Sequence, residues 1–226
     1  RRSRRGVSCA AHSVDVGGQK TAVEGDGVSL EAFEERCKSE PGINLVPVWR
    51  RAFSDQVTPV ELYRRLVHED DLERTSYLLE SVTTDGNVGR YSFIGVDPAL
   101  EIIAKESDVT VIDSRGTQQQ TSSFTLDDPW THIKELSSSF KPAEVEKLPR
   151  AFSGGWVGYG GYDTARYAET GKLPFSAAPT DTHHLPDLHM SIFRKCITFD
   201  LKNKVCYLIS WVDLREHDTS EAAHQE

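Results

Sequence analysis

The chain has 226 residues, of which 38% are hydrophobic and 27% are charged, which is typical of a globular chain with a sizeable core. No run of about eighteen apolar residues occurs, so no membrane-spanning helix is expected. The formal net charge of −9 disfavours a nucleic-acid partner, because nucleic acids attract basic surfaces.

The first segment of the chain is basic. Residues 1–22 hold five basic residues and one acidic residue, a balance of +4 that leaves −13 on the remainder. An arginine- and serine-containing, acid-poor start is typical of an organelle transit peptide. Within it, Val7-Ser8-Cys9-Ala10 resembles the loose pattern at which chloroplast transit peptides are cut, which places cleavage at Cys9 and Ala10. We expect residues 1–25 to lie outside the fold; the alternative is a basic tail that binds an acidic partner.

Both ends of the sequence suggest a longer precursor. Position 1 is arginine and the only methionine is Met190, so we expect a processed chain or a part of one. Residues 213–226 hold five acidic residues without strong apolar periodicity, which predicts a linker. The predicted organisation is therefore a tail over 1–25, a folded region over 26–212 and a linker over 213–226.

Three helices are predicted in chain order. Residues 29–39 carry apolar side chains at helical spacing. Thr58-Pro59-Val60-Glu61 predicts a capping box, in which the Thr58 hydroxyl accepts from the Glu61 amide and the Glu61 carboxylate reaches back to the Thr58 amide. The third helix starts with the same cap-then-proline pattern at Asp128 and runs to about Phe140.

The strand-like segments are short and lie close together in sequence. Short turns separate the first four, which predicts an antiparallel meander, because parallel neighbours need long crossovers. Two later runs flank a polar turn and predict a hairpin. The fold class is α+β, with antiparallel β-sheets and flanking helices. The four runs are Ser76–Val82, Arg90–Val96, Leu100–Ala104 and Val109–Asp113, and the hairpin joins Ser191–Asp200 to Val205–Val212.

The metal-binding residue types occur in no standard arrangement. The four cysteines form no CxxC unit, and Cys196 and Cys206 lie in apolar runs that predict buried, reduced thiols. Acidic residues of the 29–39 helix favour a solvated helix face over a metal site. The spacing of histidines and aspartates over 181–189 matches no zinc pattern and favours a connecting loop. We therefore predict no metal residue.

A glycine-rich run covers Gly154 to Asp163. It lacks the order of a phosphate-binding loop, and no Walker lysine follows it. Its glycines predict close backbone packing or positive φ near a strand-to-helix junction. Tyr159, Tyr162 and Asp163 are predicted to be structural, and no catalytic residue is assigned.

Two motifs in the right order resemble a known family. The first is Leu78-Leu79-Glu80-Ser81, followed after ten residues by Ser92, and the second is the glycine-rich run followed by Arg166 and Tyr167. Together they resemble the N-terminal region of anthranilate synthase component I of the plant, chloroplast type. The resemblance runs from about Phe33 to about Val212 and implies the N-terminal part of that chorismate-utilising fold.

The resemblance implies a pocket for L-tryptophan as feedback inhibitor. Carried over, its residues are Glu80, Ser81 and Ser92; a carboxylate can hold the ammonium group and hydroxyls can bind the carboxylate. The alternative for Glu80 and Ser81 is an exposed strand end. Bacterial members often carry a lysine immediately before the distant serine, where this chain has Tyr91. Arg90 replaces that lysine only if the strand bulges, because adjacent strand residues face opposite sides.

The resemblance also implies a reaction, the conversion of chorismate and ammonia to anthranilate and pyruvate. A separate glutamine amidotransferase subunit supplies the ammonia, and Mg²⁺ assists in the full enzyme. The family's catalytic and metal residues lie in a C-terminal half beyond the matched region. We therefore expect the 226-residue chain alone to form no anthranilate, and the full protein to act in the chloroplast stroma.

Three alternatives remain. The first is aminodeoxychorismate synthase of the folate pathway, which shares this N-terminal architecture. The second is a non-catalytic amino-acid-binding module. The third is an α+β interaction domain without this function. A downstream catalytic half would distinguish an enzyme from a module.

Overall fold

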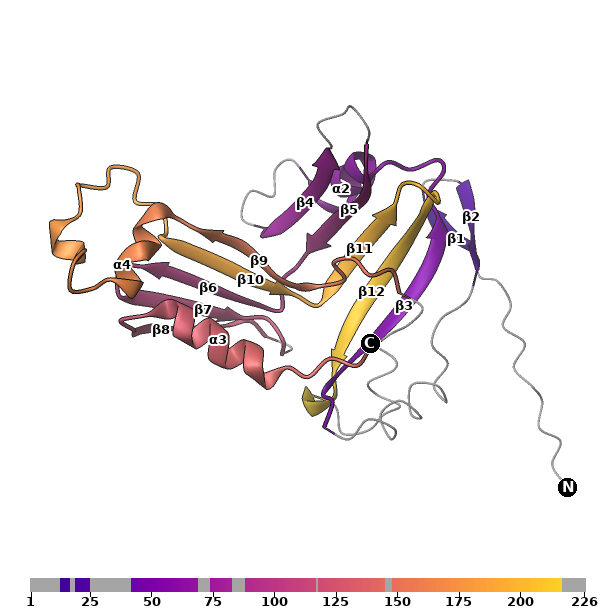
Figure 1. Cartoon of the computed structure of the whole chain (residues 1–226). Coiled ribbons are helices and arrows are strands. Elements are labelled where there is room, and N and C mark those ends of the chain that lie inside the picture. The colour runs from indigo at the N-terminus through magenta and orange to yellow at the C-terminus, as the bar shows by residue number, and fades with distance from the viewer. Residues whose placement is uncertain are drawn as a thin grey trace, which may run out of the picture.

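The computed structural model describes residues 13–16, 19–24, 42–68, 74–82, 88–116, 118–144 and 148–216. Cys9, Ala10 and the predicted 29–39 helix lie outside these residues. Two antiparallel sheets with flanking helices form the fold, which confirms the α+β class (Figure 1). No described helix is long and apolar enough to cross a membrane.

A seven-stranded sheet contains both ends of the described chain. Its strand order is β1-β2-β3-β12-β11-β5-β4, and every described pair is antiparallel. In that order the strands are Ser13–Val16, Gln19–Glu24, Leu45–Phe53, Val205–Asp213, Lys195–Asp200, Val88–Val96 and Ser76–Val82.

A five-stranded antiparallel sheet lies beside it, with the order β8-β7-β6-β10-β9 (Figure 1). The helices are short: α2, α3 and α4, with 3-10 turns at Tyr162–Thr164, Phe175–Ala177 and Leu214–Glu216. The strands are Gln120–Thr125, Asp108–Asp113, Leu100–Lys105, Leu188–Phe193 and Gly155–Gly160, and the three helices are Pro59–Leu66, Pro129–Ser139 and Ala165–Ala168.

The helix α2 begins at the predicted cap. The Thr58 side chain accepts from the Glu61 amide at 3.1 Å, and Pro59 occupies the first turn. The reciprocal half of the predicted capping box is wrong, because the Glu61 carboxylate binds Arg65 at 2.6 Å, one helical turn further on. The apolar side of α2 packs against Ile94 and Phe199 of the seven-stranded sheet.

The helix α3 covers one face of the five-stranded sheet and forms the largest apolar cluster. Its predicted cap is present, because the Asp128 side chain accepts from the Trp130 amide at 3.0 Å. Ile133 is buried against Ile102 and Leu188 of the sheet. The helix ends at Ser139, one residue before the predicted end.

The chain crosses from one sheet to the other at two points, and the sequence predicted neither of them. The run Ser191–Asp200 is not one strand: β10 ends at Phe193 in one sheet and β11 begins at Lys195 in the other. The predicted four-stranded meander is likewise interrupted, because β5 and β6 belong to different sheets. At the crossing between β5 and β6, Asp97 has φ of 54° and precedes Pro98. The chain leaves the seven-stranded sheet at this point.

Described strands extend into both predicted terminal segments. Within residues 1–25, β1 and β2 form a hairpin, and Val23 of β2 pairs with Ala52 of β3. The predicted linker over 213–226 begins with ordered residues. Asp213 ends β12 with 1% exposure, and its carboxylate binds Arg215 at 2.5 Å. Pairing with β3 holds the described residues of these segments in the sheet.

The glycine-rich run forms β9 and the junction to a short helix, as predicted. Gly154 and Gly155 have φ of +135° and +131°. A Cβ at Gly158 would overlap the His189 carbonyl oxygen of β10, so this glycine permits close strand packing. The predicted structural role of Tyr162 is wrong, since its side chain is 96% exposed.

Aromatic packing joins the sheets beside the crossings. The Tyr77 ring of β4 meets Phe193 edge-on at 4.7 Å, and its hydroxyl donates to the Cys196 sulfur at 3.3 Å. Burial raises the pKa of Tyr77. Cys196 and Cys206 are buried and free, as predicted, and burial raises the pKa of the Cys206 thiol to about 11.

Candidate functional site

The Leu-Leu-Glu-Ser motif lies on β4, where its pairing with β5 becomes irregular. Glu80 is the direct partner of Ser92, but the next pair joins Val82 to Val88. Two steps along β4 therefore match four steps along β5. This mismatch is a β-bulge, a feature that redirects side chains at a strand end. The turn over residues 83–87 lies outside the described residues.

The three serine and glutamate candidates differ in exposure and direction. Glu80 and Ser92 share one face as direct partners, yet Glu80 is exposed and Ser92 has 1% exposure. Ser92 is buried because Phe199 of β11 pairs with it on its other side. Ser81 is exposed and, by strand alternation, points away from the Glu80 face. The structure therefore brings the three residues close in the sheet but distributes them over two faces.

Gly89 permits the close approach of Ser81 to β5. A Cβ added at Gly89 would overlap the Cβ and the carbonyl oxygen of Ser81. The motif comparison did not include Gly89, although a glycine two residues into a strand is a common signal for a bulge or close approach.

Arg90 lies on β5 in the irregular stretch between the Glu80–Ser92 and Val82–Val88 pairs. Its guanidinium donates to the Asp200 carboxylate at 2.8 Å and lies over the Tyr91 ring, 4.8 Å from the centroid. Its charge is therefore placed beside the Tyr91 side chain. Asp200 also accepts from the Asn203 amide group at 2.9 Å. Burial raises the pKa of Asp200, but its bonds to Arg90 and Asn203 outweigh burial and leave the pKa lowered.

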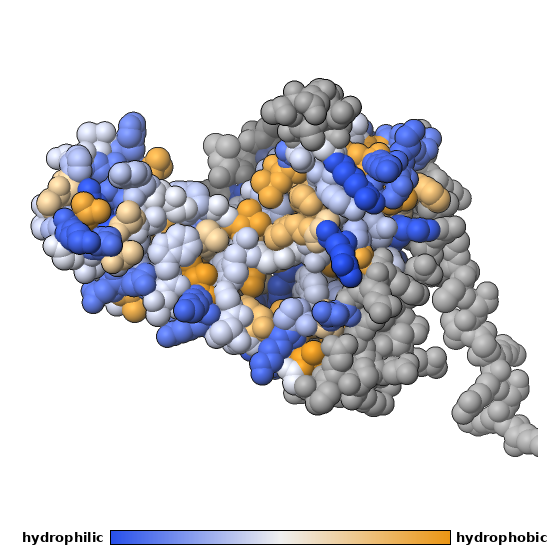
Figure 2. All heavy atoms as spheres, in the orientation of Figure 1, coloured by the Kyte–Doolittle hydropathy of each residue, from blue (hydrophilic) through white to orange (hydrophobic). Residues whose placement is uncertain are grey.

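A row of aromatic side chains begins at Tyr91 and crosses the face of the sheet on which the Tyr91 ring lies. Tyr91 stacks on Phe93 with ring centroids 6.3 Å apart, and Phe93 meets Phe152 edge-on at 5.8 Å. Leu79 pairs with Phe93 across the strands and is 46% exposed. Figure 2 shows hydrophobic side chains gathered over β4 and β5 on the face turned to the viewer. Apolar surface therefore adjoins the Arg90 guanidinium.

This arrangement offers complementary chemistry to a free aromatic amino acid. A guanidinium can bind a carboxylate by charge-assisted hydrogen bonds, and the aromatic row can cover an apolar ring. Because β4 is an edge strand, the Glu80 carboxylate is accessible at the sheet edge although it belongs to the other face. Ser81 follows Glu80 on β4 and lies against Gly89 of β5.

Side chains of the histidine-containing segment, residues 181–189, form ion pairs and hydrogen bonds with the neighbouring strand β6. Asp181 and Asp187 both bind the Lys105 ammonium, at 2.6 and 3.1 Å. His189 lies 3.0 Å from the Glu101 carboxylate instead. Within the described ranges, no group of three or more His, Cys, Asp or Glu side chains is placed to hold a metal ion.

A polar cluster surrounds the buried Glu101 side chain, and no sequence motif indicates it. One Glu101 oxygen accepts from Thr75 at 2.6 Å and from Ser191 at 3.4 Å, and it also meets His189. The bond with His189 is the largest cause that holds the pKa of Glu101 below its usual range. These partners lie 26 to 90 residues from Glu101 in the sequence, so no local pattern identifies them.

Curated proteins similar to this chain carry the name anthranilate synthase. No protein-family model matches the chain. Anthranilate synthase alpha subunit 1, chloroplastic, of Oryza sativa subsp. indica is 41% identical over all of this chain and 38% of its own length. The chain is homologous to part of the anthranilate synthase alpha subunit. Alpha subunit 1, chloroplastic, of Arabidopsis thaliana is 46% identical over 76% of this chain and 29% of its own.

More distant relatives of this alpha-subunit homologue are bacterial. Anthranilate synthase component 1 of Acinetobacter calcoaceticus is 32% identical over 87% of the chain and 37% of its own length. A crystal structure of anthranilate synthase component I from Streptococcus pneumoniae TIGR4 aligns with a TM-score of 0.44 at 24% identity, over 76% of this chain and 34% of that chain. The chain thus spans about a third of the length of the curated relatives it matches.

Proposed function

We propose that this chain is part of an anthranilate synthase component I that converts chorismate and ammonia to anthranilate and pyruvate. The identity to chloroplastic alpha subunits across the whole chain supports this function. In the same proposal a glutamine amidotransferase subunit supplies ammonia, and the enzyme works in the chloroplast stroma. The proposal includes Mg²⁺ as an aid to this lyase reaction, with ligands that lie outside this chain.

We further propose that the bulged end of β4 and β5 helps to bind L-tryptophan as feedback inhibitor. The observation that carries this proposal is the joint position of Ser81, the Arg90 guanidinium and the Tyr91–Phe93 aromatic row. In the bound state Arg90 holds the amino-acid carboxylate while the indole packs against the aromatic row. Glu80 holds the ammonium group at the strand edge. Ser92 is buried and pairs with Glu80, so it acts by positioning that residue.

The test uses the full-length enzyme with Ser81→Phe. The added ring blocks the space beside Gly89, so tryptophan inhibition should weaken at least tenfold while anthranilate formation continues. Ser122→Phe, on the exposed strand β8, is the matched control and should leave inhibition unchanged. The measurement is anthranilate fluorescence from chorismate, Mg²⁺ and ammonium against tryptophan concentration. Unchanged inhibition in Ser81→Phe would remove Ser81 from the binding site.

Product analysis of the same full-length enzyme tests the reaction itself. The expected product is 2-aminobenzoate with release of pyruvate. Formation of 4-amino-4-deoxychorismate instead would assign the protein to the folate pathway. Tryptophan binding without any turnover of chorismate would support an amino-acid-binding module.

A further inference from the structure

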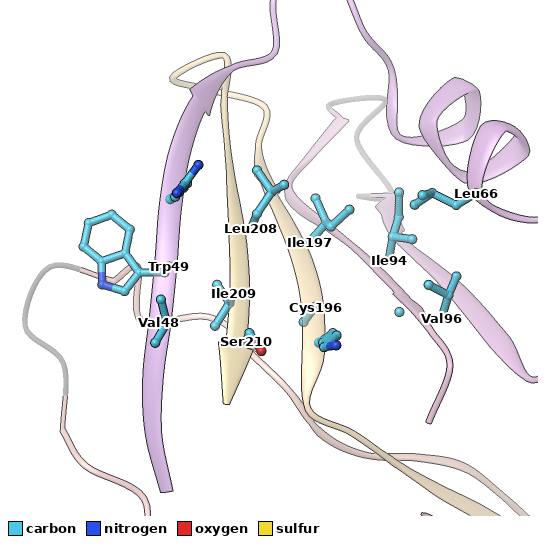
Figure 3. Close-up of a pocket in the computed structure, with 13 residues that line it drawn as sticks. Val48, Trp49, Leu66, Ile94, Val96, Cys196, Ile197, Leu208, Ile209 and Ser210 are labelled. Carbon is cyan, nitrogen blue, oxygen red and sulfur yellow. The ribbon is translucent and has the colours of Figure 1, made fainter. Parts of the chain in front are cut away.

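The face of the seven-stranded sheet that carries α2 is only partly covered by that helix. Leu62 and Leu66 of α2 pack beside Ile94 on β5. Next to the helix an apolar groove of about 420 Å³ crosses β11, β12 and β3. Figure 3 shows Leu208, Ile197 and Ile94 in a row across three strands, with Leu66 at its end.

The groove combines a closed floor with an accessible apolar wall. Ile94 has 1% exposure, whereas Leu208 is 46% exposed although it lies on an inner strand. Single exposed leucines are ordinary, but Leu208 continues into the half-buried side chains of Val48 and Ile197. The volume lies within the range of small-molecule sites, which are mostly apolar with a few polar groups that set orientation.

Two cations stand in this apolar lining. Arg50 and Lys195 are exposed, and neither side chain forms a hydrogen bond or ion pair with another residue that the structure describes. The described lining contains no acidic side chain. Asp97 lies near Lys195 but is bound to Arg74 at 2.6 Å. A doubly positive apolar groove in a chain of net charge −9 favours an anionic ligand.

The strand register directs both cations toward the same point. Arg50 pairs with Leu208, and Lys195 pairs with Ser210, two residues further along β12. The two cations therefore share one face, about 10 Å apart across β12 and about 7 Å apart along it. Their long side chains can bend toward each other over Leu208 and Ser210 and bind one carboxylate between them.

We propose that this groove binds a small amphipathic carboxylate. Its apolar body packs on Leu208, Ile197 and Val48, and its carboxylate is held by charge-assisted hydrogen bonds from Arg50 and Lys195. The proposal is independent of the proposed function, because no residue of the bulged site lines the groove.

The test titrates the whole chain, with methyl groups labelled for NMR, with octanoate and separately with uncharged 1-octanol. Octanoate should saturate and shift the methyl signals of Leu208, Ile197 and Val48. Arg50→Gln and Lys195→Gln should each weaken octanoate binding about tenfold, because each removes one charge-assisted bond. Lys202→Gln, an exposed lysine in the β11–β12 turn, is the matched control and should bind like the wild type.

Any of the following outcomes overturns the proposal. The first is the absence of saturable binding by octanoate. The second is equal binding of octanoate and 1-octanol, or unchanged octanoate affinity in both charge variants. The third is a concentration-dependent shift of the groove methyls without ligand, because this would show that a second copy of the chain covers the groove.

Discussion

At the residue scale, the proposed tryptophan site depends on one glycine that has no chemistry of its own. Gly89 lies where any Cβ would overlap Ser81 of the neighbouring strand. The absence of a side chain permits the bulge, and the bulge lets Arg90 reach Asp200 while lying over Tyr91. The family resemblance identified Glu80, Ser81 and Ser92, but it could not identify Asp200, because that carboxylate lies 110 residues from Arg90.

Gly89→Ala should lower the free energy of unfolding by about 1–3 kcal/mol, because the methyl group forces the strands apart. Gly171→Ala is the control, since a Cβ there meets nothing within 4 Å, and its effect should be near zero. Urea denaturation of both variants measures the difference. Equal stability of the two variants would contradict the proposed steric role of Gly89.

At the element scale, residues close in sequence determine where the helices start, whereas they do not determine which strands pair in the sheets. Thr58 and Asp128 cap their helices with side-chain acceptors, as the sequence predicted. The interaction of Glu61 with Arg65 rather than with the Thr58 amide shows that an ion pair one turn ahead can replace the second half of a capping box. Strand β8 was not predicted, because five of its six residues are polar and all six are exposed.

Thr58→Ala tests the capping bond. Loss of the only side-chain acceptor described for the Glu61 amide should cost about 1 kcal/mol of stability. Thr182→Ala, in an exposed loop, removes the same hydroxyl without loss of a cap and should be nearly neutral. The change in thermal midpoint reports both. A Thr58→Ala midpoint equal to that of Thr182→Ala would show that the cap contributes nothing measurable.

At the scale of the whole molecule, the Glu101 cluster joins the two sheets. Glu101 belongs to β6 of the five-stranded sheet, whereas Thr75 directly precedes β4 of the seven-stranded sheet. His189 and Ser191 of β10 complete the cluster. Because the pKa of Glu101 is lowered by folding, its ionised form stabilises the folded state. That contribution is present above the unfolded pKa, near 4.5, and is lost as the pH falls through the lower folded pKa.

Glu101→Gln should therefore reduce stability by about 1–3 kcal/mol at pH 7, through lost charge-assisted hydrogen bonds. The difference from the wild type should narrow as the pH falls from 5 to 3. Urea denaturation at pH 7, 5 and 3 measures it, and Glu135→Gln on the exposed side of α3 is the control. If the difference in unfolding free energy between the variant and the wild type stays constant over this pH range, the ionised form of Glu101 does not stabilise the folded state.

The sequence by itself determined the α+β class, the starts of two helices, the positive φ of the glycine run and the motif that points to the family. These depend on residues within a few positions of one another, so their energetics are local. The tertiary structure alone decided which sheet each strand joins, the chain crossings at Asp97 and Arg194, and the pairing of Arg90 with Asp200. It also decided the apolar groove, since β3 must align with the distant β11–β12 hairpin before Arg50 and Lys195 share a face. Strand pairing is set by packing between distant segments, which hydrophobic periodicity within one segment does not specify.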